Sequence, residues 1–242
     1  MRVAVVSDIH ANLHALEAVL ADVDAQTPDE MWCLGDVVGY GANPNECCEL
    51  IRGRAQLPLA GNHDLGIAGL LDLAEFSGEA AAAAHWTRTV LDAEHRTWLA
   101  SLDPAASREN VELFHASPRD PVWEYVLSDE VADESFSLTT APLVLVGHSH
   151  VALALARDGT GVVGGLAPPD TELALGEHRL LLNPGSVGQP RDGNPDAAWL
   201  LVDFDTQRAV FRRVVYDVEG AQAAIRAARL PDVLAERLAR GL

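Results

Sequence analysis

The stretch RVAVVSDIHAN, residues 2–12, decides the fold of this chain because a short apolar run leads directly into polar side chains. Its β-branched residues predict a buried strand, and residues 13–23 carry apolar side chains at the spacing of a helix. Asn12 stands where a helix N-cap is expected. Asp8 and His10 follow the strand, at the position where open α/β sheets hold ligands. The stretch therefore predicts a βα unit with a polar site at its turn.

Polar motifs follow four further apolar runs in the same way. They are Gly35-Asp36 after 31–34, Gly61-Asn62-His63-Asp64 after 56–60, His115 after 111–114, and Gly147-His148-Ser149-His150 after 143–146. Because ligand sites of α/β sheets gather at the carboxyl ends of the strands, we expect these side chains to converge. Carboxylates, amide oxygens and neutral imidazoles bind divalent cations, and two cations about 3.5–4 Å apart suit the hydrolysis of a phosphate ester. The motifs therefore predict a two-metal site.

The other segments predict a single α/β domain over residues 1–242. Helices are expected at 46–51 and 129–138, with two or three more in a helical insert at 65–102 that borders the site. Beyond His150, antiparallel strands of a second sheet are expected at 152–156, 171–175, 179–182, 199–204 and 209–215. The amphipathic segment 219–242, with a break at Pro231, predicts two terminal helices. These helices either pack on the outside or pair with another subunit in a homo-oligomer.

Charge and composition exclude several classes of function. With 17 basic and 36 acidic residues the formal net charge is −19, so a long nucleic acid is an unfavourable partner. All basic residues are arginine, which excludes a lysine Schiff base and a Walker-type phosphate loop. Cys33, Cys47 and Cys48 show neither disulfide nor zinc spacing, and no secretion leader or membrane span is expected. We expect a cytoplasmic protein that acts on a small phosphate ester and has no membrane contact.

Six motifs, taken in order, carry a resemblance to a known family. They are SDIHAN, GDVVGYG, GNHD, FHASP, GHSH and NPGSVGQPR, which run from Asp8 to Arg191 over about three quarters of the chain. With these motifs the chain resembles the calcineurin-like metallophosphoesterase superfamily, in particular its small bacterial and archaeal phosphodiesterase-like branch. The resemblance implies a four-layer α/β/β/α sandwich in which helices flank two mixed sheets.

The resemblance also implies a centre of two divalent metal ions, with manganese as first choice and iron, zinc or nickel as alternatives. The implied ligands are Asp8, His10 and His150 on the first ion, Asn62, His115 and His148 on the second, and Asp36 bridging both. The implied activity is that of a phosphodiesterase-like hydrolase. In such an enzyme hydroxide shared between the metals attacks a small phosphodiester or a nucleotide.

Four residues near these motifs have two interpretations each. The resemblance makes His63 contact phosphate and protonate or stabilise the leaving oxygen, and the alternative is a structural hydrogen bond. Asp64 either orients His63 or caps the following helix. Tyr40 either stacks on an aromatic leaving group or packs within its loop. Arg191 either binds phosphate or forms a salt bridge in its loop.

Several alternative functions remain open from the sequence. Two are hydrolases with other substrates, namely a diadenosine-polyphosphate or nucleotide pyrophosphatase and a phosphomonoesterase. Another is a non-catalytic scaffold of the same fold. The protein serine/threonine phosphatases of the superfamily are disfavoured, because they carry an Asp-Arg pair where Gly39-Tyr40 stand here.

Overall fold

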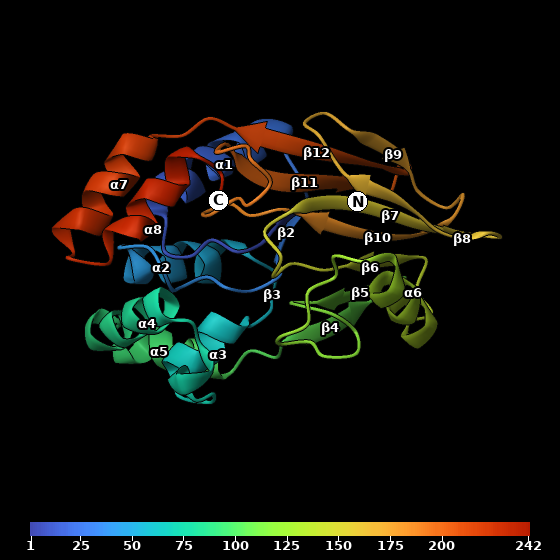
Figure 1. Cartoon of the computed structure of the whole chain (residues 1–242). Coiled ribbons are helices and arrows are strands. Elements are labelled where there is room, and N and C mark those ends of the chain that lie inside the picture. Colours follow the sequence, from blue (N-terminus) through green and yellow to red (C-terminus); the bar gives the residue numbers. More distant parts are fainter.

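Two sheets of six strands each, packed face to face, form the centre of the computed structural model, which describes residues 1–242 (Figure 1). In spatial order, the first sheet contains β3 (Leu57–Pro58), β2 (Glu30–Cys33), β1 (Arg2–Val6), β11 (Ala197–Asp203), β12 (Arg208–Val214) and β9 (Glu172–Ala174). The second contains β4 (Ala105–Arg108), β5 (Val111–Phe114), β6 (Leu143–Leu145), β10 (Arg179–Pro184), β7 (Ala152–Asp158) and β8 (Gly161–Leu166). Both sheets are mixed, because β1 is parallel to β2 but antiparallel to β11, and β10 is parallel to β6 but antiparallel to β7.

Helices lie on the outer faces of the two sheets and around the candidate site. They are α1 (Leu13–Gln26), α2 (Pro44–Arg54), α3 (Asn62–Ala68), α4 (Gly78–Val90), α5 (Ala93–Ala100), α6 (Asp129–Leu138), α7 (Val218–Ala227) and α8 (Asp232–Glu236), with 3-10 turns η1 (Leu73–Glu75) and η2 (Arg237–Ala239). The side chain of Asn12 accepts a hydrogen bond of 3.2 Å from the backbone N–H of Ala15. The predicted N-cap of α1 is thus confirmed.

Three apolar clusters hold the layers together. The largest packs α1, α2, α7 and α8 on the outer face of the first sheet, where Trp199 is fully buried. A second fills the space between the sheets and contains Trp32 and Leu182. The third attaches α6 to the second sheet through Phe136. This order of helices, sheet, sheet and helix confirms the predicted four-layer sandwich, and each large side chain buried in it contributes roughly 1.5–3 kcal/mol.

The two predicted helical segments take the expected secondary structure. The insert, residues 65–102, contains no strand. It includes most of α3 together with α4 and α5, and α3 packs on both of these helices below α2 in the view of Figure 1. Pro231 separates α7 from α8, and α7 packs on α1 of the same chain. The buried face of α7, with Ala221 and Ile225, is therefore covered within the chain.

The sheets differ from the sequence prediction in three respects. The sequence does not predict β4 and β8, because AASR is weakly apolar and GVVGGL contains three glycines that lower strand propensity. β3 has two residues, shorter than the predicted 56–60, because Pro58 has no N–H for a longer ladder. The strands beyond His150 do not form a sheet of their own, since β9, β11 and β12 complete the first sheet and β7, β8 and β10 the second. Alternation reveals a half-buried strand but not the sheet that it joins.

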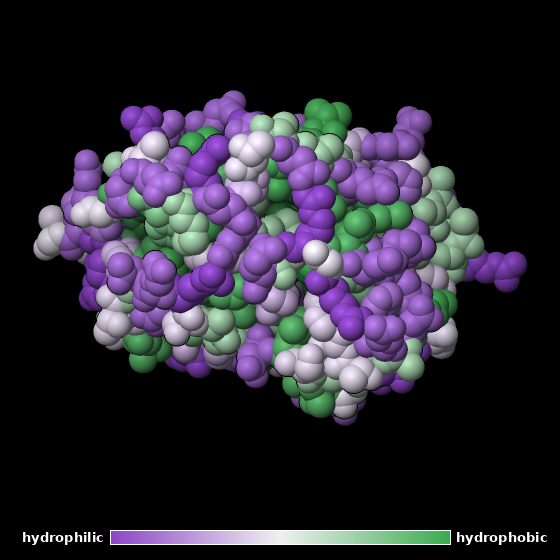
Figure 2. Space-filling model, turned by 180° about the vertical axis from the view of Figure 1, so that it is seen from behind, coloured by the Kyte–Doolittle hydropathy of each residue, from purple (hydrophilic) through white to green (hydrophobic).

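Hydrophilic residues cover most of one face of the molecule. Figure 2 shows this face, opposite to that of Figure 1, with hydrophobic residues scattered between the hydrophilic ones. This agrees with the formal net charge of −19. No helix combines the length and the apolar character that crossing a membrane requires.

Candidate metal centre

The predicted ligands lie together, buried at one edge of the two sheets. Asp8 and Asp36 follow β1 and β2, which are parallel neighbours, so that both residues emerge on the same side. His115 follows β5, and His148 and His150 follow β6, its parallel neighbour in the second sheet. Each motif therefore reaches the site because a strand ends there.

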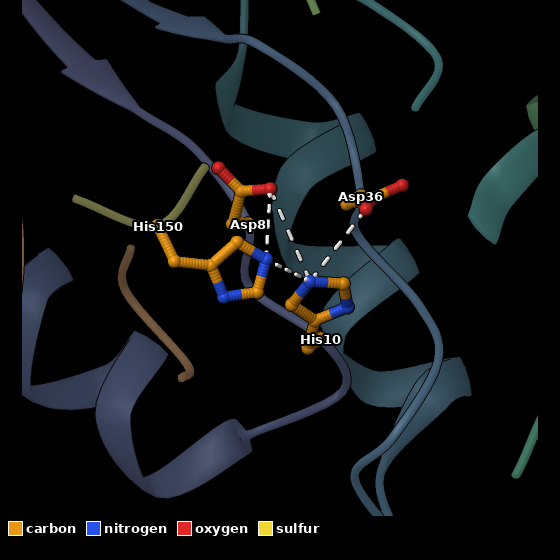
Figure 3. Close-up of side chains that lie close together, drawn as sticks. All are labelled: Asp8, His10, Asp36 and His150. Atoms are coloured by element: carbon orange, nitrogen blue, oxygen red, sulfur yellow. Dashed lines mark hydrogen bonds and ion pairs between the residues drawn. The ribbon is translucent and has the colours of Figure 1, made fainter. Parts of the chain in front are cut away.

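Two groups of potential ligand atoms share one carboxylate. The groups are Asp8, His10, Asp36 and His150, and Asp36, His115 and His148, with the ligand atoms of each group within 4.8 Å of one another. Figure 3 shows the side chains of the first group directed toward one another. Asn62 lies beside the second group, since its Oδ1 is 3.3 Å from Nε2 of His115. The structure thus brings together all seven residues that the resemblance names, with Asp36 in both groups.

Each of the two carboxylates has one oxygen bound to the protein and one that is free. Oδ2 of Asp8 accepts hydrogen bonds from Oγ of Ser7 at 2.6 Å and from the backbone N–H of His148 at 3.1 Å. Oδ1 of Asp36 accepts a bond of 2.9 Å from the backbone N–H of His63. The other oxygens, Oδ1 of Asp8 and Oδ2 of Asp36, are buried without a hydrogen-bond partner. Unpaired buried acceptors are costly, and a cation would satisfy both of them.

Backbone carbonyls fix the tautomer of each candidate histidine ligand. Nδ1 of His10, His115 and His150 lies 3.2, 2.8 and 2.7 Å from the carbonyl oxygens of Val38, Leu34 and Gln189, respectively. These carbonyls can only accept, so Nδ1 carries the proton and Nε2 presents a lone pair to the site. His148 is reversed, because its Nε2 donates to the carbonyl of Trp123 at 3.1 Å and its Nδ1 faces His115. Such outer hydrogen bonds are typical of metal-binding imidazoles.

Burial sets the charge states of the site. It raises the pKa of Asp8 to about 7 and pushes the pKa of Asp36 well above its ordinary value, with added repulsion from Asp64. It also lowers the pKa of His115 to about 3 and the pKa of His10 well below 6.5. The imidazoles are therefore neutral near pH 7, and the two carboxyl groups retain their protons to higher pH than usual because nothing compensates the charge of their ionised forms. This donor set fits a pair of divalent cations.

The backbone is strained at most of the candidate ligands. Five of the seven have left-handed φ angles, namely Asp8 (54°), His10 (49°), Asp36 (54°), His148 (62°) and His150 (59°). Residues other than glycine avoid this region, and its occurrence clusters at functional sites. Gly61 shows how closely the chain is packed here, because a Cβ at this position would overlap the carboxylate of Asp36. The sharp turns aim the polar side chains into one volume.

A pocket of about 190 Å³ opens beside the two groups. Asp36, Asn62, His63, His148 and His150 contribute to its lining. The predicted substrate residues Tyr40 and Arg191 line it as well. Arg191 donates to Oε1 of Gln189 at 3.0 Å and to the hydroxyl of Tyr40 at 3.4 Å, and no carboxylate pairs with it.

His63 and Asp64 have different surroundings although they are neighbours. His63 lines the pocket, and its Nδ1 is buried without a hydrogen-bond partner. Asp64 accepts hydrogen bonds from the backbone N–H groups of Gly61, Val37 and Val38. It therefore caps α3 and joins two loops of the site, and it does not orient His63.

Three aromatic residues that line the pocket were not found from the sequence. They are Phe76, Trp123 and Tyr125, which come from the end of η1 and from the loop after β5. The WEY sequence in that loop is an available signal, since aromatic residues in a polar loop next to a strand-end histidine are candidates for substrate contact.

Comparisons with known proteins show which family the sequence and the fold resemble. A family model described as the calcineurin-like phosphoesterase superfamily domain matches residues 1–207. The uncharacterised protein MJ0912 of Methanocaldococcus jannaschii is 42% identical over 246 residues, which cover 99% of this chain and 98% of that protein.

Two solved structures have the same fold over the whole chain. The metallophosphoesterase from Sphaerobacter thermophilus is 41% identical and superposes with a TM-score of 0.91, covering 100% of this chain and 99% of that one. The hypothetical protein PH1004 from Pyrococcus horikoshii OT3 is 21% identical with a TM-score of 0.81, covering 100% and 98%. The second likeness concerns the fold alone.

Proposed function

Because this chain belongs to the calcineurin-like phosphoesterase superfamily, we propose that it uses two divalent ions to hydrolyse a small phosphodiester or a nucleotide. The observation that carries the proposal is the free Oδ2 of Asp36, which lies 3.6 Å from Nε2 of both His10 and His115. A carboxylate oxygen between the imidazoles of two ligand groups is suited to bridging two cations.

In this proposal each group of side chains would hold one ion. Asp8, His10 and His150 would bind the first ion, Asn62, His115 and His148 would bind the second, and Asp36 would bind both. When bound, the ions would supply Lewis-acid polarisation of the phosphoryl group and would lower the pKa of water at the site. Manganese is the first choice, with iron, zinc or nickel as alternatives, because oxygen and imidazole donors accept all of them.

The chain itself binds and orients the substrate around these ions. Arg191 is the phosphate-binding residue, because its guanidinium lines the pocket without a carboxylate partner and its planar fork matches phosphoryl oxygens. Tyr40 supports it through the hydroxyl contact and packs its ring 4.5 Å from that of His63. His63 then stabilises charge on the leaving oxygen.

The complete set of candidate ligands and the adjoining pocket disfavour the alternative of a non-catalytic scaffold. All seven candidate ligands are present, and an open pocket adjoins them. A protein that only binds partners has no need for strained turns that direct five of these side chains inward. The proposal therefore keeps catalysis as the role of this site.

A substrate panel tests the proposed function. Protein freed of metal with a chelator is expected to be inactive, and added Mn²⁺ should restore hydrolysis of an activated aryl phosphodiester. Phosphomonoesters and dinucleotides are assayed beside it, and metal content is measured by elemental analysis. Undiminished activity after complete metal removal, or no hydrolysis of any ester with Mn²⁺, Fe²⁺, Zn²⁺ or Ni²⁺, would refute the proposal.

The affinity for Mn²⁺ is expected to rise with pH. The pKa of the Asp8 carboxyl is raised to about 7, so below this pH the metal must displace a proton. Each displaced proton changes the affinity about tenfold per pH unit. Calorimetric titrations between about pH 5 and pH 6 should therefore show the dissociation constant falling about tenfold, with a weaker dependence as the pH approaches 7. An affinity that is constant over this range would contradict the role of the buried carboxylates.

The cellular setting is proposed from the thiols and the charge. Cys33, Cys47 and Cys48 are free and buried, which fits a reducing compartment such as the cytoplasm. The net charge of −19 fits a small phosphate ester and opposes a long nucleic acid.

A further inference from the structure

Phe76, Trp123 and Tyr125, called here the aromatic wall, line the pocket beside the candidate metal centre. The ring of Phe76 lies 5.3 Å from that of Trp123 and 5.0 Å from that of His63, with the rings edge to face in both pairs. The ring of Tyr125 stacks on His148 at 4.3 Å with an angle of 10°. Two separate segments of the chain therefore converge to place aromatic rings next to the proposed reaction site.

Hydrogen bonds and an ion pair hold the loop that carries Trp123 in place. The carbonyl of Trp123 accepts the hydrogen bond of 3.1 Å from His148, and its backbone N–H donates to Oδ1 of Asp120 at 3.1 Å. Glu124 accepts from Oγ of Ser117 at 2.6 Å and pairs with Arg119. A wall fixed in this way loses little conformational entropy when a ligand packs against it.

The charges in the pocket limit the number of phosphoryl groups that it can accept. Arg191 is the only permanently cationic side chain of its lining, and Glu75 adds an exposed carboxylate. The proposed metals and Arg191 suit one phosphoryl group. A chain of phosphates would place further negative charges near Glu75, in a protein whose net charge is already −19.

The volume of the pocket also limits the size of the substrate. Its volume of about 190 Å³ is below the range of roughly 300–1,000 Å³ for pockets that enclose a drug-sized ligand. It has room for a phosphoryl group and one small ring system, while larger parts of a substrate would extend into solvent. A dinucleoside polyphosphate is therefore a poor match.

We infer that the substrate has a single phosphoryl group and a planar aromatic ring that packs against Phe76 and Trp123. This inference rests on the proposed function, since it names the substrate class of the same site. The helical insert, through Phe76, then selects the leaving group, and the loop after β5, through Trp123, completes the contact surface. The ring is attached to phosphorus either directly through oxygen, as in an aryl ester, or through a sugar, as in a nucleotide.

Binding of phosphonates to the Mn²⁺-loaded protein tests the inference without turnover. Phenylphosphonate is expected to bind about tenfold more tightly than methylphosphonate, because stacking on an aromatic side chain contributes about this factor or more. The advantage should fall below about threefold in Trp123→Leu and in Phe76→Leu, which keep an apolar side chain but remove the ring. Trp98→Leu is the matched control, since Trp98 lies in α5 and does not line the pocket.

A second pair of ligands distinguishes a ring attached through a sugar from a ring attached to phosphorus directly through oxygen. Adenosine 5′-monophosphate is compared with ribose 5-phosphate, and a preference for the aromatic member of either pair supports the inference. Phosphonates and nucleotides that bind no better than their ring-free partners would overturn it. The inference would also be overturned if phenylphosphonate kept its advantage over methylphosphonate in both Trp123→Leu and Phe76→Leu. A kcat/KM for diadenosine tetraphosphate above that for an aryl phosphodiester would overturn it as well.

Failure of the proposed function would look different in these experiments. A protein that hydrolyses no ester with any metal, yet retains the ring preference, would refute the enzyme and leave the aromatic subsite in place. A protein that hydrolyses aryl and alkyl esters without any ring preference would refute the aromatic subsite and leave the proposed enzyme activity in place. The alkyl ester for this comparison carries a fluorinated alcohol of acidity similar to that of phenol, so that leaving-group chemistry is matched.

Discussion

Asp36→Asn is expected to reduce phosphodiester turnover by about 10³-fold or more, because it removes the only oxygen that both groups of candidate ligands share. The amide oxygen can still accept from the backbone N–H of His63, so the turn keeps its hydrogen bond. The amide nitrogen takes the place of the free Oδ2 and can donate toward His10 or His115. The variant should therefore fold and lose the metals rather than the structure.

Metal content and thermal unfolding measure this outcome together. Wild-type protein should gain stability when Mn²⁺ is added, and Asp36→Asn should gain little, while its metal-free form is at least as stable as that of the wild type. Asp133→Asn is the matched control, because Asp133 is exposed on α6 and pairs with Arg157. A variant that keeps both ions and more than about a tenth of the activity would contradict the bridging role.

His63→Ala is expected to reduce turnover by about 10²-fold while both metals remain bound, since His63 belongs to neither group of ligands. Burial lowers the pKa of His63 to about 3, and bound cations would lower it further. The imidazole is thus neutral near pH 7 and contributes a hydrogen bond to the leaving oxygen. The loss should therefore be similar for aryl and alkyl esters.

The dependence on leaving group is the decisive measurement for this residue. If His63 transfers a proton, the loss in kcat grows steeply as the leaving alcohol becomes less acidic, and the neutral-imidazole interpretation fails. His85→Ala is the control, because His85 is exposed on α4 away from the pocket lining. Metal content determined on the same samples excludes an indirect effect through the ions.

The fold and the candidate ligands could be predicted because both have local signals. Asp8 and Asp36 follow short apolar runs that form neighbouring strands of the first sheet, and His115 follows such a run in the second sheet. The strands that precede these residues end at the same edge of the two packed sheets, as the structure shows. The assignment of the later strands to sheets could not be predicted, since alternation is the same in either sheet. β8 was missed because Gly164 and Gly165 interrupt its apolar pattern.

The residues that line the pocket were predicted only in part, for a physical reason. Tyr40 and Arg191 lie within recognisable motifs, whereas Phe76 reaches the pocket through the tertiary packing of the insert, in which α4 contacts both η1 and α3. Trp123 is fixed by a hydrogen bond to His148 that depends on tertiary packing. The role of Asp64 also needed coordinates, because its three partners are backbone groups on two loops.

The left-handed turns at the candidate ligands lower the stability of the fold. Each such residue disfavours its own conformation by roughly 1–2 kcal/mol relative to ordinary geometry, and glycine would remove that penalty. At His10 and His150, however, glycine would also remove the donor to the carbonyl of Val38 or Gln189 and would leave a cavity, and these losses offset that gain. The strained turns therefore persist because the side chains that they direct inward are also part of the packed interior.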